Sequence, residues 1–334
     1  MRKVCLLYTM NLTHRPRRLR ELKPMKTMLS ENFISKSDLI MPVFVSDFGP
    51  DKEPIQSMPE IYRWSVNALT EQIQIWYDLG LKAFALFPCI QKNKKCTLGK
   101  EALNPNSVCY EAARKIKGKF NDIALIADLA LDPFTDHGHD GVLNKDGLVD
   151  NDKTVDILCQ GALIAAGSGF DIVAPSDMMD GRVGSIRNTL DSNAFTDIAI
   201  LAYSAKFCSS YYGPFRDAVS SVQTSVIDKS GYQINPANSK EALREMILDE
   251  KEGADILMVK PAEPYLDIIK CAKDQLSLPI AAYQVSGEYS RIWAASLQGW
   301  LDLENCARES LLSIKRAGAD LILTYFAERF AKTI

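Results

Sequence analysis

Residues 239–261 read SKEALREMILDEKEGADILMVKP and contain one complete structural repeat of the predicted fold. Residues 239–252 carry apolar side chains at helical spacing, and Gly253 supplies the left-handed conformation that ends such a helix. The following run, 254–259, is continuously apolar, which indicates a parallel strand that is covered on both faces. The run ends at Lys260, so the repeat places an amine directly after a buried strand.

The same pattern recurs along the chain. The short apolar runs, rich in β-branched residues, are Leu39–Val45, Ala83–Phe87, Ile123–Leu131, Phe170–Ala174, Ile198–Tyr203, Ala254–Val259, Pro279–Val285 and Ala319–Phe326. Stretches with helical spacing separate most of them, and two of these stretches end, like the first, on a glycine (Gly80 and Gly318). Alternating strands and helices imply parallel strands with right-handed crossovers, and this number of strands predicts a (β/α)8 TIM barrel.

A doubly wound sheet is the competing α/β fold, and 334 residues are also enough for two ordinary domains. A doubly wound sheet usually opens with a Gly-rich phosphate loop after its first strand. Here the first predicted strand ends Pro42-Val43-Phe44-Val45-Ser46-Asp47, with no such glycines. No break in composition marks a second domain. We therefore predict an extended N-terminal arm, 1–30, and one barrel catalytic domain, 31–334, with long loops at 133–150 and 215–238.

Composition excludes several classes of protein. A net charge of −3 gives no general attraction to nucleic acid or to anionic membrane, and no apolar stretch approaches the roughly 20 residues that span a bilayer. The basic run 14–20 is local, and is interpreted as a solvated arm, a nucleic-acid contact or a contact with a neighbouring subunit. The eight cysteines are scattered without a Cys-x-x-Cys pair, and no secretory signal is recognisable, so we predict reduced thiols and a cytoplasmic protein.

Two of the predicted strands lead into a lysine. Lys206 follows the fifth apolar run and Lys260 follows the sixth, at the end of the barrel where catalytic groups lie. Most lysines are solvated surface charges with a pKa near 10.4, and such an ammonium is not nucleophilic. Burial and a second cation both disfavour the charged form, and lowering the pKa by about three units takes roughly 4 kcal/mol. The pair therefore predicts amines that attack a ketone to form an imine.

Other polar side chains at the predicted strand ends would assist this chemistry. Asp128 and Ser176 are candidates for moving protons to and from a carbinolamine. Cations and hydroxyls suited to substrate carboxylates are Arg216 and Lys229, and Ser286 and Tyr325. His137 and His139 are candidate metal ligands, although ordering of their loop is the simpler interpretation.

Seven blocks of the sequence resemble one family, porphobilinogen synthase, also called 5-aminolevulinate dehydratase. They are DLALDPFTDHGHDG (128–141), APSDMMDGRVGSIR (174–187), YSAKF (203–207), YGPFRDA (212–218), EGADILMVKP (252–261), YQVSGEY (283–289) and RAGADLILTYF (316–326). The blocks occur in family order, and the resemblance runs from about residue 15 to the C-terminus.

The resemblance implies the asymmetric condensation of two 5-aminolevulinate molecules to porphobilinogen, with loss of two waters, in tetrapyrrole (heme) biosynthesis. It implies that Lys260 forms the primary Schiff base and that Lys206 holds the second substrate. It also assigns Ser286 and Tyr325 to the first substrate carboxylate. The residues that it assigns to the second carboxylate or to the lining of the site are Arg216, Lys229, Gln233, Asp128, Ser176, Tyr212, Phe215 and Tyr283.

The resemblance also bears on metals. Zinc-dependent members of the family carry three cysteines where this chain has Ala130, Asp132 and Asp140, so we expect no catalytic zinc. The two carboxylates suit Mg²⁺ or a monovalent ion, which makes a site near Asp132 a candidate. Glu245 matches the family glutamate that holds an outer, allosteric Mg²⁺, whereas the sequence alone favours an ordinary surface charge there.

Two departures from the family pattern lie near the predicted mouth of the site. Ala262-Glu263 replaces the common Gly-Met, and Ser290-Arg291 stands where small or apolar residues are common. The family also forms homo-octamers from arm-hugging dimers, and the basic N-terminal segment fits such an arm. Two other interpretations stay open at this point: a class I aldolase, which needs only one imine lysine, and a non-catalytic barrel that binds or scaffolds.

Overall fold

The computed structural model describes residues 12–219 and 228–333, and the chain divides into two compact units, Met1–Phe33 and Ile34–Ile334. The division lies close to the predicted boundary after residue 30. In the first unit, a 3-10 helix η1 (Pro16–Arg20) precedes α1 (Lys23–Met28), and neither buries a side chain. Within the described ranges, no helix has the length and apolar character needed to cross a bilayer.

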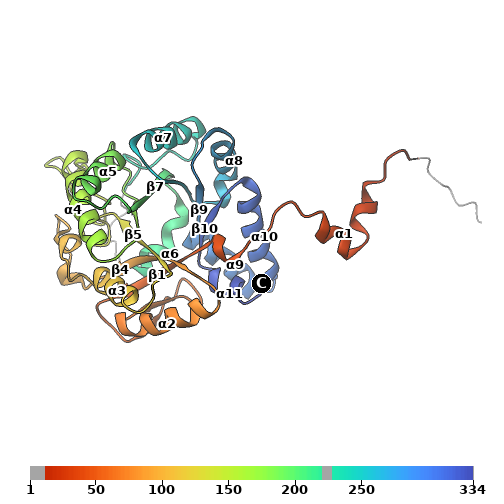
Figure 1. Cartoon of the computed structure of the whole chain (residues 1–334), viewed down its shortest axis with the longest axis horizontal. Coiled ribbons are helices and arrows are strands. Elements are labelled where there is room, and N and C mark those ends of the chain that lie inside the picture. Colours follow the sequence, from red (N-terminus) through yellow and green to blue (C-terminus); the bar gives the residue numbers. More distant parts are fainter. Residues whose placement is uncertain (1–11, 220–227, 334) are drawn as a thin grey trace, which may run out of the picture. The chain divides into compact units, whose positions relative to one another are not determined.

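The second unit is a closed barrel of parallel strands (Figure 1). The ten strands are β1 (Leu39–Ser46), β2 (Lys52–Pro54), β3 (Tyr62–Trp64), β4 (Ala83–Cys89), β5 (Ala124–Leu129), β6 (Ile172–Pro175), β7 (Ala199–Lys206), β8 (Ile256–Lys260), β9 (Ile280–Gln284) and β10 (Leu321–Thr324). All but β2 and β3 form the barrel in chain order, and β10 pairs with β1 to close it. The predicted TIM barrel is confirmed.

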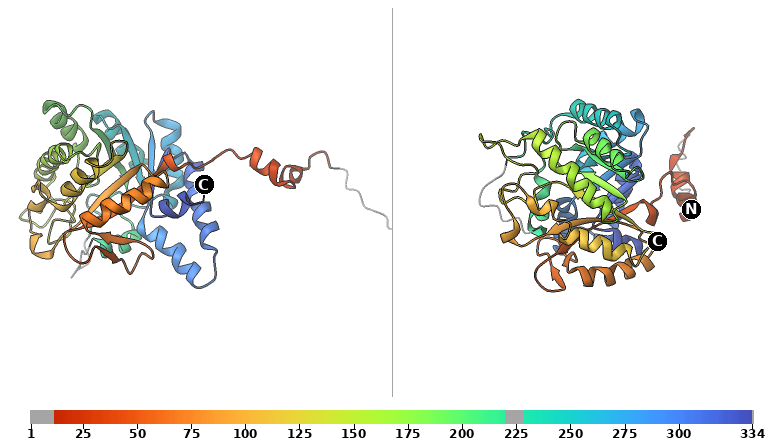
Figure 2. Two further views of the ribbon diagram at one scale, coloured as in Figure 1. Left: turned by 60° about the horizontal axis from the view of Figure 1, so that its bottom comes forward. Right: turned by 60° about the vertical axis from the view of Figure 1, so that its left-hand side comes forward.

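Helices surround the strands, as Figures 1 and 2 show. The helices of this unit are α2 (Val66–Asp78), α3 (Val108–Lys117), α4 (Asn151–Gly167), α5 (Arg182–Ser192), α6 (Gly213–Ala218), α7 (Ser239–Glu252), α8 (Leu266–Gln275), α9 (Ser286–Leu297), α10 (Leu303–Ala317) and α11 (Ala327–Ala331). The 3-10 helices are η2 (Lys36–Asp38), η3 (Lys92–Lys94), η4 (Lys100–Leu103), η5 (Ser210–Tyr212) and η6 (Glu263–Tyr265). The core lies between this layer and the barrel, and inside the barrel itself.

Local sequence explains where the helices begin and end. Gly80, Gly253 and Gly318 have φ values of 90°, 101° and 123°, which confirms the glycine stops predicted from sequence. At the start of α4, the Asp150 carboxylate accepts a hydrogen bond from Lys153 N at 3.3 Å, and Asp302 caps α10 in the same way. Each stop turns the chain directly into the next buried strand.

The structure also differs from the prediction at particular segments. The antiparallel pair β2 and β3, beside β1, had no counterpart among the predicted strands, because three-residue strands carry almost no periodic signal. The start of the predicted loop 215–238 is wrong: Phe215 lies in α6, where Pro214 at the first turn favours helical φ. Residues 220–227 of that loop lie outside the described residues. Lys206 and Lys260 are the last residues of β7 and β8 and do not follow them.

Candidate active site

A cavity of about 490 Å³ lies at the carboxyl ends of the barrel strands. It is walled by most of the residues that the sequence proposed for catalysis and substrate binding: Lys206, Tyr212, Phe215, Arg216, Lys229, Gln233, Lys260, Tyr283, Ser286 and Tyr325. Asp132 and Asp140 also line it. The volume suits a small polar substrate, and the walls bring residues from four strand ends and two loops together.

Lys260 lies at the end of β8 with 8% of its surface exposed. Its Nζ lies 4.6 Å from the ring centre of Tyr283, 4.9 Å from Tyr203 and 5.3 Å from Tyr212. Burial, assisted by the charge of Lys206, lowers the pKa of Lys260 to about 7. A substantial fraction of the amine is therefore neutral near neutral pH, as nucleophilic attack requires.

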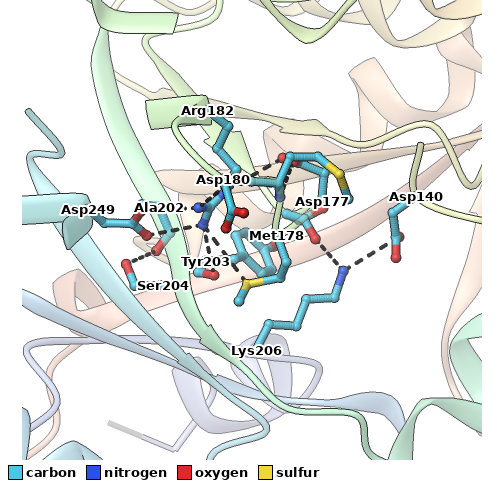
Figure 3. Close-up of polar contacts among 12 residues, drawn as sticks. Asp140, Asp177, Met178, Asp180, Arg182, Ala202, Tyr203, Ser204, Lys206 and Asp249 are labelled. Atoms are coloured by element: carbon cyan, nitrogen blue, oxygen red, sulfur yellow. Dashed lines mark hydrogen bonds and ion pairs between the residues drawn. The ribbon is translucent and has the colours of Figure 1, made fainter. Parts of the chain in front are cut away.

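Lys206 is the register partner of Lys260 on the neighbouring strand. Neighbouring strands lie about 4.8 Å apart, so the two amines leave the barrel wall side by side. Lys206 Nζ donates a hydrogen bond to the backbone oxygen of Ser176 and lies 3.6 Å from Asp140 Oδ1 (Figure 3). The two lysines predicted from sequence thus occupy one site.

Asp128 and Ser176, which the sequence also proposed, are not among the residues that line this cavity. The Asp128 carboxylate lies close enough to Lys260 and Lys206 for their charges to act on its pKa. Its Oδ1 is buried without a hydrogen-bond partner among the described residues. Burial raises the pKa of Asp128 to about 6, against the opposing charge of Lys260. A carboxyl that titrates near 6 beside an amine that titrates near 7 is suited to moving protons during imine formation.

A second charged cluster lines the cavity next to Lys206. Lys229 Nζ is 3.2 Å from Asp140 Oδ2 and 3.9 Å from Asp132 Oδ2, and Gln233 Nε2 donates to Asp140 Oδ2 at 3.4 Å. Burial alone would raise the pKa of Asp140, but the charges of Lys206 and Lys229 outweigh it and lower this pKa to about 2. Asp140 is therefore a permanent anion that holds Lys206 and Lys229 in place.

The hydroxyls predicted to bind a carboxylate, those of Ser286 and Tyr325, also line the cavity. Tyr283 and Tyr325 share a hydrogen bond of 2.9 Å between their hydroxyls. Ser286 Oγ accepts a hydrogen bond from Phe215 N at 2.9 Å, which joins the start of α9 to α6. Burial raises the pKa of Tyr325, so its hydroxyl stays protonated and can donate to an anion.

Sequence reasoning missed Tyr203, whose ring faces Lys260. Tyr203 and Lys206 are three positions apart, and in a regular strand they would point to opposite faces. The register between β7 and β8 shifts between Ala202 and Ala205, and this irregularity lets both side chains serve the same site. A bulge of this kind has no sequence signature.

A buried ionic cluster behind Lys206 was also missed. Arg182 Nη2 lies 3.1 Å from Asp249 Oδ2 and 3.3 Å from the backbone oxygen of Tyr203, and Asp177 lies 3.7 Å from Arg182 Nε (Figure 3). The guanidinium joins α5 and α7 to the strand that carries Lys206. Arg182 is the first residue of α5, where a positive charge interacts unfavourably with the helix dipole. This unfavourable position was the one indication in the sequence that Arg182 has a specific partner.

Replacing Arg182 with Met is expected to lower the free energy of unfolding by about 3–5 kcal/mol, because two buried carboxylates lose their counter-charge. The midpoint of urea unfolding, followed by circular dichroism, measures the loss. Lys270→Met is the matched control, since its ion pair with Asp274 is exposed and contributes about 0–1 kcal/mol. Equal midpoints for the two variants would contradict the importance of the cluster.

The candidate metal ligands are dispersed. His137 Nε2 lies 3.2 Å from the backbone oxygen of Thr97, and His139 Nδ1 lies 3.2 Å from the hydroxyl of Tyr232, which favours the loop-ordering interpretation of both. Glu245 lies on α7, far along the chain from these, beside Arg244 at 3.6 Å. Among residues 12–219 and 228–333, no three His, Cys, Asp or Glu side chains are grouped as metal ligands.

Comparison with known proteins gives consistent results. A model of the family "Delta-aminolevulinic acid dehydratase" matches residues 13–333. The delta-aminolevulinic acid dehydratase of Bradyrhizobium diazoefficiens is 47% identical over 325 residues, which cover 97% of this chain and 92% of that protein. The Chlamydia pneumoniae enzyme of the same name is 48% identical over 319 residues, covering 96% of each. A Toxoplasma gondii structure of this enzyme, in complex with its reaction product porphobilinogen, superimposes with a TM-score of 0.94 at 44% identity, covering 97% and 92%.

Proposed function

The chain belongs to the delta-aminolevulinic acid dehydratase family, and from that premise we propose that Lys260 and Lys206 form the two imines of its reaction. The activity is the condensation of two 5-aminolevulinate molecules to porphobilinogen, a lyase reaction of porphyrin biosynthesis that releases two waters. The observation that carries the assignment is the pair of buried lysines, side by side on β7 and β8 in one cavity. A class I aldolase needs only one such amine.

Lys260 attacks the keto carbon of the first substrate. The neutral amine adds to the carbonyl, a proton reaches the oxygen, and loss of water leaves an iminium. We infer that Asp128, whose pKa burial raises to about 6, gives and takes these protons. The rings of Tyr203, Tyr212 and Tyr283 surround the nitrogen and stabilise its positive charge.

The carboxylates of the two substrates are proposed to bind on opposite walls. Ser286 and Tyr325 would donate hydrogen bonds to the first carboxylate, whereas Arg216, Lys229 and Gln233 would bind the second. Lys229 has three N–H donors, so its contact with Asp140 leaves donors for a substrate. Holding both ketones beside adjacent amines makes the bond-forming steps intramolecular, which contributes several kcal/mol.

The reaction is tested by supplying 5-aminolevulinate alone, in the presence of Mg²⁺, of Zn²⁺ and of neither, and measuring porphobilinogen. Reduction with borohydride in the presence of one substrate should add the mass of the reduced imine to the peptide that contains Lys260. A protein that forms neither product nor trapped imine under any metal condition would refute the proposal.

We propose that Glu245 holds an allosteric Mg²⁺ and that the active site holds no catalytic zinc. Burial raises the pKa of Glu245, and the charges around it are mixed: Arg244 and Arg182 lower this pKa, whereas Asp249 and Asp180 raise it. A single protein carboxylate fits Mg²⁺, which keeps most of its waters. Ala130, Asp132 and Asp140 offer no thiolate, which does not fit zinc.

Glu245→Gln is expected to weaken Mg²⁺ binding about tenfold or more, measured by calorimetric titration, and to remove stimulation of activity by Mg²⁺. Glu241→Gln, a change at a half-buried position one turn earlier on the same helix, is the matched control and should leave binding unchanged. Tight zinc in the purified protein, with activity lost to a zinc-selective chelator, would contradict the metal assignment.

We also propose that a monovalent ion or Mg²⁺ can bind near Asp132. Lys229 already lies between Asp132 and Asp140 and neutralises much of their charge. A metal there would have to displace this ammonium, so binding should strengthen as Lys229 is replaced by Met.

We propose a homo-octamer built from dimers, with the arm 1–30 packed on a neighbouring subunit. The described part of this segment exposes a series of apolar side chains: Leu12, Leu19, Leu22, Met28 and Leu29. Exposed apolar side chains in series are typical of a surface that binds a partner. Light scattering with and without Mg²⁺ measures the assembly, and a monomer indifferent to Mg²⁺ would contradict it.

We propose a cytoplasmic location and no nucleic-acid or membrane partner. The seven cysteines at described positions are free thiols, which suits a reducing compartment. The net charge of −3 gives no attraction to anionic polymers or lipids.

A further inference from the structure

Residues 209–219, here called the wall segment, carry a large share of the cavity lining. The segment contains η5 and α6, and it contributes Tyr212, Phe215 and Arg216 to the cavity. Tyr212 donates hydrogen bonds to the backbone oxygens of Phe207 at 2.8 Å and Lys260 at 3.3 Å. The position of this segment therefore sets where the second substrate can lie.

One end of the wall segment is tied to an ion pair. Glu263, after β8, and Arg291, on α9, form a salt bridge in which the glutamate side chain is only 15% exposed. Arg291 Nη1 also donates to the hydroxyl of Tyr211 at 3.2 Å, and its guanidinium lies 5.4 Å from the ring centre of Tyr211. Arg291 thus links Tyr211 to Glu263, which follows the end of β8.

The main chain of Glu263 is held by a hydrogen bond to a buried side chain. Its backbone N–H donates to Glu288 Oε1 at 2.6 Å, and Glu288 is fully buried at the start of α9. The main chain at Glu263 is therefore held in place, and its carboxylate reaches Arg291 from a fixed backbone position. The Glu263 side chain is therefore shielded from water, whereas the Arg291 side chain is 42% exposed.

The other end of the wall segment is tied to Ser290. Ser290 Oγ donates to the backbone oxygen of Ser57 at 2.7 Å, and Ser57 Oγ donates to Asp217 Oδ2 in α6 at 2.5 Å. Ser290 and Arg291 are neighbours on α9, so one helical turn reaches Tyr211 directly and Asp217 through Ser57. These positions are the ones at which the sequence departs from the family pattern.

Close packing transmits the position of Tyr211 to the substrate-binding groups. A Cβ at Gly287 would lie 2.4 Å from Tyr211 O, so the first turn of α9 contacts this backbone directly. Ser286 Oγ lies 3.5 Å from Tyr211 O and accepts the hydrogen bond from Phe215 N. Any displacement of Tyr211 therefore moves Ser286 and Phe215.

We propose that Glu263 and Arg291 are positioning residues that hold the wall segment against the barrel and so set the affinity for substrate. The inference rests on the proposed function of the cavity, because it requires Phe215, Arg216 and Ser286 to contact substrate. Neither Glu263 nor Arg291 touches the reacting atoms, so their loss changes KM and leaves kcat nearly constant.

The experiment is a double-mutant cycle with E263Q, R291M and the double variant, each checked for folding by circular dichroism. Each single variant is expected to raise KM for 5-aminolevulinate about fivefold with kcat within about twofold. The double variant should raise KM no further, because the second change removes an interaction already lost. R291K, which keeps the charge without the planar fork, should rescue KM in part.

Lys270→Met is the matched control, since it breaks an exposed ion pair on the neighbouring helix α8. Hydrogen exchange supplies a second readout, and peptides from 209–219 should exchange faster in E263Q and R291M but not in the control. An unchanged KM in folded variants, or KM effects that multiply in the double variant, would overturn the proposal. Failure of the proposed function would give a different result from failure of this inference. In that case the unmodified protein itself would form no porphobilinogen and no trapped imine.

Discussion

Lys260→Met is expected to lower kcat/KM for porphobilinogen formation on the order of 10⁴-fold or more, the scale of losing a covalent catalyst. The methionine keeps the length and apolar stem of the side chain, so the ring faces of Tyr203, Tyr212 and Tyr283 stay covered. What is removed is the amine whose pKa burial and the charge of Lys206 lower to about 7. No other amine occupies this position on β8.

The measurement pairs the porphobilinogen assay with borohydride trapping of the imine. Lys260→Met should yield no adduct at the β8 peptide, while Lys153→Met, an exposed lysine at the start of α4, should behave like the unmodified protein. Residual activity within about tenfold of the unmodified protein would show that the primary imine forms elsewhere.

The barrel was predictable because each strand is marked by an apolar run, and three of the strands also by a glycine that ends the preceding helix. A continuous apolar run such as 254–259 indicates burial on both faces, and a glycine such as Gly253 fixes where the preceding helix must stop. Lys206 and Lys260 could then be located, because carboxyl ends of parallel strands meet at one face. These signals are local in sequence.

The missed features depend on contacts between distant segments. Arg182 can be buried because Asp249, 67 positions away, supplies its counter-charge. The sequence around either residue does not predict that the two form an ion pair. Tyr203 reaches Lys260 through an irregularity of β7 that propensities do not record. Glu263 and Arg291 were recognised as departures, but their contact with each other was not, because it requires the relative placement of β8 and α9. Resemblance supplied roles for single positions, whereas only the structure gives their mutual geometry.

Lys206→Met is expected to abolish most porphobilinogen formation and, separately, to shift the pH dependence of imine formation at Lys260 upward. The cation of Lys206 is one of the causes that lower the pKa of Lys260, so its removal raises this pKa from about 7 toward the ordinary value. At neutral pH the neutral amine then falls about tenfold for each unit of rise. The second substrate also loses its anchoring amine, so the intramolecular advantage is lost with it.

Borohydride trapping at Lys260 with 5-aminolevulinate, measured from pH 6 to about 10, separates these two effects. In the unmodified protein the adduct should reach half its maximum near the pKa of Lys260, and in Lys206→Met only at clearly higher pH, with full trapping recovered there. Porphobilinogen formation should not recover at the higher pH, because the missing amine cannot be replaced by deprotonating another. An unshifted trapping profile would show that Lys206 does not act electrostatically on Lys260, and recovery of product at high pH would show that the second substrate needs no imine at Lys206.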